Sequence, residues 1–270
     1  MIGELAIFGA IAAGLSARWN WWRPSVFNGM PVLMYHKIGD YPPGSELKKL
    51  WVTAANFRKQ LEYLRDHGYT AIDFRDWRDA ERGVRALPEK PVIITFDDGY
   101  MNNYDNAYPL LREFGMKGCI FLVYETMEKH NSWHDPKTEP WLKMLTWAQI
   151  KEMQDSGLVE FGSHTMRHRN LTELPLDEMT WELTESKKRL EEKLGREMVG
   201  FAYPYGSGAY KDDVRRAALG AGYRFDFSVK QGISTVPWNR AKEAVKRLLI
   251  RGDDTMFDFH LNMTRGKARF

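Results

Sequence analysis

The sequence predicts an α/β fold in which about seven parallel strands, each followed by a helix, form a closed or nearly closed barrel. Short apolar stretches rich in β-branched residues alternate with amphipathic stretches along most of the 270 residues. A glycine follows most of the amphipathic stretches, at the point where a helix would end. Polar side chains of the kind found in active sites follow several apolar stretches, as they do in barrels.

The composition is that of one folded domain. Hydrophobic residues make up 43% of the chain and charged residues 28%, and the length suits a single large α/β domain. The net charge of +3 comes from 39 basic and 36 acidic residues without a long basic block, so we expect no nucleic-acid partner. The single cysteine, Cys119, lies in an apolar stretch; it excludes an intramolecular disulfide and a cysteine-based zinc site.

Residues 1–28 differ from the rest, and we expect the main domain to span residues 29–270. An apolar stretch at 5–15 precedes three tryptophans and two arginines, a mixture favoured at membrane interfaces. The stretch is shorter than the ~20 residues that cross a bilayer, and Glu4 stands where a signal peptide carries a basic residue. We expect a membrane-associated helix or an amphipathic helix packed on the domain or a partner. The expected location is the cell envelope or a membrane surface, with the cytoplasm as the alternative.

The first third of the main domain predicts three strands and two helices. A buried strand at 31–36 ends in His36. A helix at 53–67 has apolar residues at helical spacing, Thr53 as its N-cap and Gly68 as its stop. A strand at 69–74 and a short helix at 76–83 lead to the apolar strand at 91–96.

The remainder continues the alternation. Further strands are expected at 117–123, 159–162, 198–203 and 224–229, with a possible last strand at 247–250. Helices are expected at 106–114, 146–156, 175–194 and 211–219. The insertion at 124–145 is polar, rich in tryptophan and irregular, and such a stretch more often lines a site than builds the scaffold.

The strand at 91–96 ends in two adjacent carboxylates, Asp97 and Asp98, followed by Gly99. Adjacent acids at a strand end repel each other and resist desolvation, so a fold that keeps them there usually has a metal ion or a catalytic task to offset the cost. A solvated Asp-Asp-Gly turn is the alternative, which the tripeptide alone would favour.

His164 and His168 are four residues apart, which places two imidazoles on one face of a helical turn and suits two ligands of one metal ion. With Asp98 as a third ligand, one coordination position stays open for water, as in a catalytic rather than a structural zinc site. An isolated pair with this spacing is more often incidental, but its coincidence with the two carboxylates favours a metal site.

Three ordered motifs resemble those of the polysaccharide deacetylase family, the NodB-homology domains of carbohydrate esterase family four. They are Thr95-Phe-Asp-Asp-Gly-Tyr100, Ser163-His-Thr-Met-Arg-His168 and Phe201-Ala-Tyr-Pro-Tyr-Gly206. The resemblance covers about residues 31–251 and implies a distorted (β/α) barrel of about seven strands. The first strand and the third motif look most like the branch that deacetylates poly-N-acetylglucosamine.

The resemblance implies a role for each matching residue. Asp98, His164 and His168 would hold one divalent metal ion, zinc first and cobalt or nickel as alternatives. Asp97 would be the general base. The backbone N–H of Tyr205, fixed by Pro204, would donate to the oxyanion.

Two departures from the family pattern leave roles open. Ala202 stands where the family commonly has an arginine that orients the base. Arg167, Arg247 and Arg251 are the candidates to replace it. The family's general-acid histidine near the C-terminus has no clean match either. We prefer His36 for this role, because it ends the first strand and would face the same mouth as Asp97, with His260 as the alternative.

The leading hypothesis is therefore a metal-dependent hydrolase that removes N-acetyl groups from an amino sugar in a glycan and releases acetate. The alternatives are a deacylase of a lipid-linked amino sugar or another small amide, and a pseudoenzyme that binds glycan without catalysis. Three tryptophans could stack on sugar faces: Trp133, Trp141 and Trp147.

Overall fold

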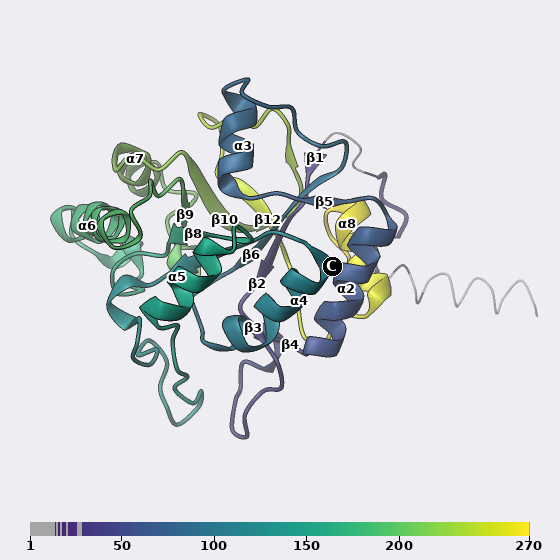
Figure 1. Ribbon diagram of the computed structural model, residues 1–270, viewed down its shortest axis with the longest axis horizontal. Helices are drawn as coiled ribbons and strands as arrows, with labels where there is room; N and C mark the ends of the chain where they lie inside the picture. Colours follow the sequence, from purple (N-terminus) through teal and green to yellow (C-terminus); the bar gives the residue numbers. More distant parts are fainter. Residues whose placement is uncertain (1–13, 15, 17, 20, 26–28, 270) are drawn as a thin grey trace, which may run out of the picture.

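The computed structural model describes residues 14, 16, 18, 19, 21–25 and 29–269, and its centre is a closed barrel of seven parallel strands (Figure 1). The ring runs in the order β2 (Val32–Tyr35), β12 (Val245–Leu249), β10 (Phe225–Gln231), β9 (Gly200–Ala202), β8 (Val159–Ser163), β7 (Gly118–Leu122) and β6 (Pro91–Phe96). Pairing of β2 with β6 closes it. The expected α/β barrel is confirmed.

The inside of the barrel is apolar at one end and polar at the other. Alternate residues of β6 point inward, so Ile93 lies in the apolar half while Thr95 lies nearer the carboxyl end. Helix α3 (Phe74–Glu81) covers the amino end, where Trp77 stacks on Phe225 with ring centroids 4.1 Å apart. A Cβ on Gly200 would lie 2.8 Å from the Phe74 ring, so this close approach requires glycine. Because α3 closes the amino end, the open mouth of the barrel is at its carboxyl end.

A second apolar layer packs the remaining helices against the outside of the strands. Thr53 caps the first of them, since its Oγ1 accepts from the Asn56 amide at 3.2 Å, and Gly195 ends the longest in a left-handed conformation. Figure 1 shows α6 and α7 on one side of the barrel, with α2 and α8 on the opposite side. The helices are α2 (Ala54–Asp66), α4 (Tyr108–Phe114), α5 (Trp147–Asp155), α6 (Leu176–Leu194), α7 (Asp212–Gly220) and α8 (Met256–Arg265).

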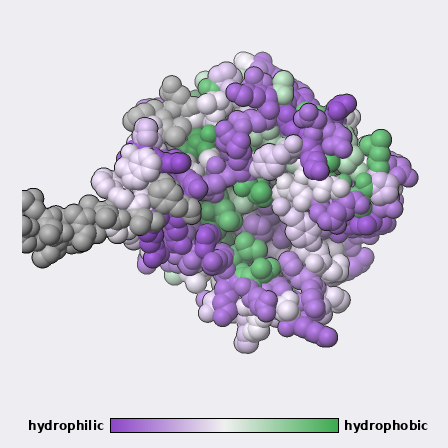
Figure 2. All heavy atoms as spheres, turned by 180° about the vertical axis from the view of Figure 1, so that it is seen from behind, coloured by the Kyte–Doolittle hydropathy of each residue, from purple (hydrophilic) through white to green (hydrophobic). Residues whose placement is uncertain are grey.

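Two short strand pairs lie outside the ring. Near its amino end, β1 (Gly29–Met30) pairs antiparallel with β11 (Ser234–Thr235). Beyond the carboxyl end of β2, β3 (Lys37–Ile38) pairs with β4 (Trp51–Val52). The face seen in Figure 2 is mostly hydrophilic, with hydrophobic residues gathered in a hollow near its centre.

One expected ring strand is wrong. The stretch 69–74 forms only β5 (Thr70–Ala71), which pairs with the start of β6 outside the ring. The strand stops because Asp73 caps α3: its Oδ1 accepts from the Asp76 amide at 2.8 Å, which starts the helix at Phe74. The expected possible last strand supplies the seventh ring member instead, as β12.

Most of the segment 1–28 lies outside the described residues. Of its described residues, Trp19 donates from Nε1 to Asp258 Oδ1 at 2.7 Å and contacts Phe257 edge to face, both on α8. No helix of the described residues is both long and apolar enough to cross a membrane. The expected membrane-associated helix stays a prediction.

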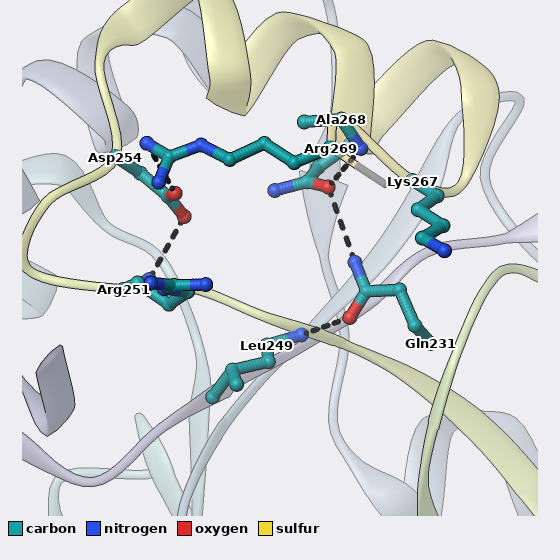
Figure 3. A pocket seen from close by; sticks show the side chains of 8 residues that line it. Gln231, Leu249, Arg251, Asp254, Lys267, Ala268 and Arg269 are labelled. Carbon is teal, nitrogen blue, oxygen red and sulfur yellow. Dashed lines mark hydrogen bonds and ion pairs between the residues drawn. The ribbon is translucent and has the colours of Figure 1, made fainter. Parts of the chain in front are cut away.

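A small pocket of about 170 Å³ lies where β10 and β12 meet α8 (Figure 3). Gln231 crosses it, with Oε1 accepting from the Leu249 amide at 3.0 Å and Nε2 donating to Asn262 Oδ1 at 3.1 Å. Asp254 accepts from the Arg251 amide at 2.9 Å and lies 3.2 Å from Arg269. Because these polar groups bond one another, we interpret the pocket as the joint between α8 and the barrel.

Asp254 should make this joint sensitive to pH. Burial raises its pKa to about 6, although the Arg251 amide and Arg269 oppose the shift. The folded state therefore binds a proton more tightly than the unfolded state, and this stabilisation is lost as the pH rises through about 6. Between pH 4.5 and 7, wild type should lose about 2 kcal/mol of unfolding free energy relative to Asp254→Asn. Urea unfolding at both pH values measures it, and parallel pH profiles would contradict the assignment.

Candidate metal and catalytic centre

The carboxyl ends of five ring strands bring the expected site residues to one mouth. Asp97 and Asp98 follow β6, and the two histidines of the His-x-x-x-His pair follow β8. Pro204 and Tyr205 follow β9, while His36 follows β2. The fifth strand, β12, contributes Arg247 from its interior-facing side.

Asp98, His164 and His168 form a buried cluster that could hold a metal ion. Their candidate ligand atoms all lie within 4.8 Å of one another. Oδ1 of Asp98 is 3.3 Å from Nε2 of His164 and 3.2 Å from Nε2 of His168. Two imidazole nitrogens and a carboxylate oxygen are a donor set suited to zinc and to other divalent transition metals.

The hydrogen bonding of His164 shows that these residues fit a cation. Its Nδ1 lies 2.8 Å from the carbonyl oxygen of Ala202, which can only accept, so Nδ1 carries the proton. In the neutral imidazole, Nε2 therefore presents a lone pair to the carboxylate of Asp98. Two lone pairs at 3.3 Å repel unless a cation or a further proton lies between them. The Ala202 carbonyl thus orients one nitrogen of His164 for metal binding.

The expected helical turn between the two histidines is wrong. Residues 164–168 form a loop in which Thr165 has φ 71° and His168 has φ 59°. Asp98 (φ 78°) and Tyr205 (φ 57°) are also left-handed. In a non-glycine residue this conformation costs roughly 1–3 kcal/mol in backbone strain, and such strain clusters at functional sites. Four of the five described non-glycine residues with positive φ thus lie at this mouth.

Arg247 is the cation that faces Asp97. Its Nη1 and Nη2 donate to Oδ1 and Oδ2 of Asp97 at 2.6 and 2.8 Å, and its Nε donates to the Ser228 carbonyl at 2.9 Å. Both side chains are buried. A planar guanidinium bound to both carboxylate oxygens fixes the plane of the carboxylate. Three arginines are candidates to replace the arginine that is missing at Ala202. Arg247 is the one that pairs with Asp97, while Arg167 and Arg251 pair with other acids.

Both carboxylates are ionised at neutral pH. Burial raises the pKa of Asp97, but attraction to Arg247, His164 and His36 outweighs it and leaves the pKa below the usual value. Burial also raises the pKa of Asp98, and the neighbouring imidazoles of His164 and His168 outweigh it, so its pKa lies well below the usual range. The candidate base, Asp97, and the candidate metal ligand, Asp98, therefore both carry a negative charge.

The two candidate histidines for the general acid lie in different places. Nε2 of His36 is 4.0 Å from Oδ2 of Asp97. Burial lowers the pKa of His36, with partial opposition from Asp97 and Asp98, so the imidazole is neutral at neutral pH. His260 lies on α8, where its Nδ1 is 2.9 Å from the Tyr63 hydroxyl. The described contacts of His260 are thus with α2, on the outside of the barrel.

Tyr205 borders the metal cluster. Its ring meets the His168 ring edge to face, with centroids 4.6 Å apart, and 54% of the residue is exposed. Gly206 follows with φ 69°, and a Cβ there would lie 2.2 Å from Val229. The turn that carries Tyr205 is therefore held against β10 by a contact that requires glycine.

The expected site-lining role of the insertion agrees with the position of Trp133. Its ring stacks on His168 with centroids 4.3 Å apart, so it covers a metal-cluster residue. Glu139 anchors this insertion: its carboxylate accepts from Lys37 Nζ at 2.8 Å and from Ser45 Oγ at 2.7 Å. Sequence reasoning missed this anchor. The available signal was Lys37, a lysine in an apolar strand pattern that needs an acidic partner when buried.

The pair of Asp97 and Arg247 should be strongly coupled in stability. Arg247→Met leaves a buried carboxylate without its partner, so we expect a loss of about 3–5 kcal/mol in unfolding free energy. Arg247→Met combined with Asp97→Asn should lose much less than the sum of the single variants, because the unpaired charge is gone. Urea unfolding of the four proteins measures the coupling. Additive losses would show that the pair does not act as a unit.

Comparison with known proteins identifies relatives. The profile of the family described as polysaccharide deacetylase matches residues 85–225. A candidate polysaccharide deacetylase of Bacillus subtilis (strain 168) is 30% identical over 207 residues, 76% of this chain and 66% of the relative. The chain thus spans about two thirds of that relative's length. The poly-beta-1,6-N-acetyl-D-glucosamine N-deacetylase of Staphylococcus aureus (strain MRSA252) is 26% identical over 244 residues, 84% of this chain and 80% of the relative.

A solved structure supports the same relationship. The polysaccharide deacetylase of Bacillus cereus superposes with a TM-score of 0.72 at 30% identity, covering 87% of this chain and 69% of that one. The similarity therefore extends beyond the stretch that the family profile matches. The chain belongs to the polysaccharide deacetylase family.

Proposed function

We propose that the protein is a metal-dependent deacetylase that hydrolyses the N-acetyl group of an amino sugar in a poly-N-acetylglucosamine-like glycan and releases acetate. The observation that carries the proposal is the position of Asp97. Arg247 donates to both oxygens of this ionised carboxylate. Asp97 follows the strand that also supplies Asp98 to the metal cluster. A site built to bind glycan without hydrolysis has no need of an oriented, charged base beside a metal site.

The metal site has a defined donor set. Asp98, His164 and His168 would hold the ion, and the Ala202 carbonyl keeps His164 in the tautomer that binds it. A bound divalent ion would act as a Lewis acid that polarises the acetamide carbonyl and lowers the pKa of a coordinated water.

Two residues of the chain, Asp97 and His36, would carry out the proton transfers. Asp97 accepts the proton of the attacking water as its oxygen bonds to the acetamide carbon, and Arg247 keeps the carboxylate in place. The backbone N–H of Tyr205 donates to the developing oxyanion. As the carbon–nitrogen bond breaks, His36 passes a proton from Asp97 to the leaving nitrogen, which leaves acetate and a free amine.

Metal removal should abolish activity. Chelator-treated protein is expected to release no acetate from poly-N-acetylglucosamine, chitin oligomers or a lipid-linked acetamido sugar, and zinc should restore release from its true substrate. His164→Ala and His168→Ala should lower the bound metal found by elemental analysis, while His260→Ala retains it. Full activity of a metal-free protein would refute the mechanism. Inactivity of the metal-loaded protein on all three substrates would favour the pseudoenzyme.

His36 and His260 provide a matched test of the general acid. His36→Ala should lower kcat roughly 10²–10⁴-fold, the usual contribution of a positioned acid or base. His260→Ala removes a histidine that contacts α2, so its kcat should stay near wild type. Steady-state acetate release measures both, with circular dichroism as the check on folding. Near-wild-type turnover of both variants would remove His36 from the mechanism.

A further inference from the structure

We propose a second sugar-binding site at Trp181 on α6, which holds a distant unit of the same glycan chain while another unit is deacetylated. The inference rests on the proposed function and adds to it the preferred substrate length and the direction in which the polymer leaves the mouth. Trp181 lies outside the three family motifs and is 36% exposed.

Three hollows that share lining residues lie between the metal cluster and Trp181, and we call this row of hollows the trough. The hollow at the mouth is lined by His168, Tyr205 and Trp133, together with Arg167 and Arg169. The same two arginines line the next hollow, which ends at Trp181 and Asp177. Those two residues in turn line a third hollow along α6. The volumes run from about 440 to 670 Å³, within the range of small-molecule sites.

The floor of the trough is held in place before any ligand binds. The buried carboxylate of Glu182 on α6 accepts from the amides of Met166 and Arg167 at 2.9 and 3.0 Å, which ties the loop after β8 to the helix. The Arg167 guanidinium lies 4.5 Å from the centre of the Trp181 ring and donates to Glu125 at 3.0 Å. Ordering of this kind reduces the entropy that a ligand must overcome.

The chemistry of the trough suits a polysaccharide. The Trp181 indole is partly exposed and Arg167 lies over its ring, so the exposed part of the indole offers an apolar surface to the C–H groups that sugars present between their hydroxyls. Arg169 and Glu178 form an ion pair beside it at 2.8 Å, and Asp177 supplies a further carboxylate to hydroxyl or amine groups. An aromatic side chain edged by paired charges, in a row of hollows that starts at the mouth, fits an uncharged or partly deacetylated chain better than a small free amide.

Trp181→Ala tests the site against chain length. It should raise KM for long poly-N-acetylglucosamine about three- to tenfold with kcat unchanged, and leave kinetics on a di- or trisaccharide as in wild type. Trp181→Phe should recover most of the affinity. Phe257→Ala is the matched control, because Phe257 is an exposed aromatic residue of a helix, α8, and lines none of the three hollows. Equal KM for Trp181→Ala and wild type on the polymer would overturn the proposal.

Binding by the chelated protein separates this inference from the proposed function. Affinity electrophoresis through gels that contain poly-N-acetylglucosamine should retard metal-free wild type and Phe257→Ala, but not Trp181→Ala. Retardation of wild type with no acetate release by the metal-loaded protein would support the Trp181 site and refute the deacetylase. Equal mobility of wild type and Trp181→Ala in these gels would overturn the site, whether or not acetate is released.

Discussion

The contact between Asp97 and Arg247 joins the architecture of the barrel to its chemistry. A carboxylate at the end of β6 is stable inside the barrel because the guanidinium from β12 binds both of its oxygens. The two strands are not neighbours: β2 stands between them in the ring. The ion pair therefore bridges β2 on the interior side of the ring and connects the two strands that flank it.

The amino half and the carboxyl half of the barrel interior have different physical roles. Its amino half is filled by aromatic side chains from α3 and the strands, which contributes burial and excludes water. Its carboxyl half holds the charged residues, where each charge has a partner within the described site. Strain follows the same division, because four left-handed non-glycine residues lie at the polar mouth. The apolar half and the packed helices supply the stability that offsets this strain.

The sequence allows the strand ends and the residues of the candidate metal cluster to be predicted, because both depend on local patterns. Asp98, His164 and His168 each follow an apolar strand, so parallel strands bring them to one end. The partner of Asp97 is different. Arg247 lies 150 residues away, and nothing in its neighbourhood separates it from a solvated arginine; the register of β12 alone places it. The backbone conformation of residues 164–168 could not be predicted from the spacing of the histidines either, because that spacing does not indicate which residues are left-handed.

The position of Arg247 in the last ring strand bears on the order in which the site assembles during synthesis. A nascent chain extended to residue 206 already contains both metal-binding histidines, Asp98 and the proposed oxyanion donor. It does not yet contain β10 or β12, so Asp97 has no guanidinium partner and the ring is open between β9 and β2. The three residues of the candidate metal cluster are thus complete at His168, about 80 residues before Arg247, the partner of Asp97. The hydrolytic centre becomes competent as the last strand closes the ring.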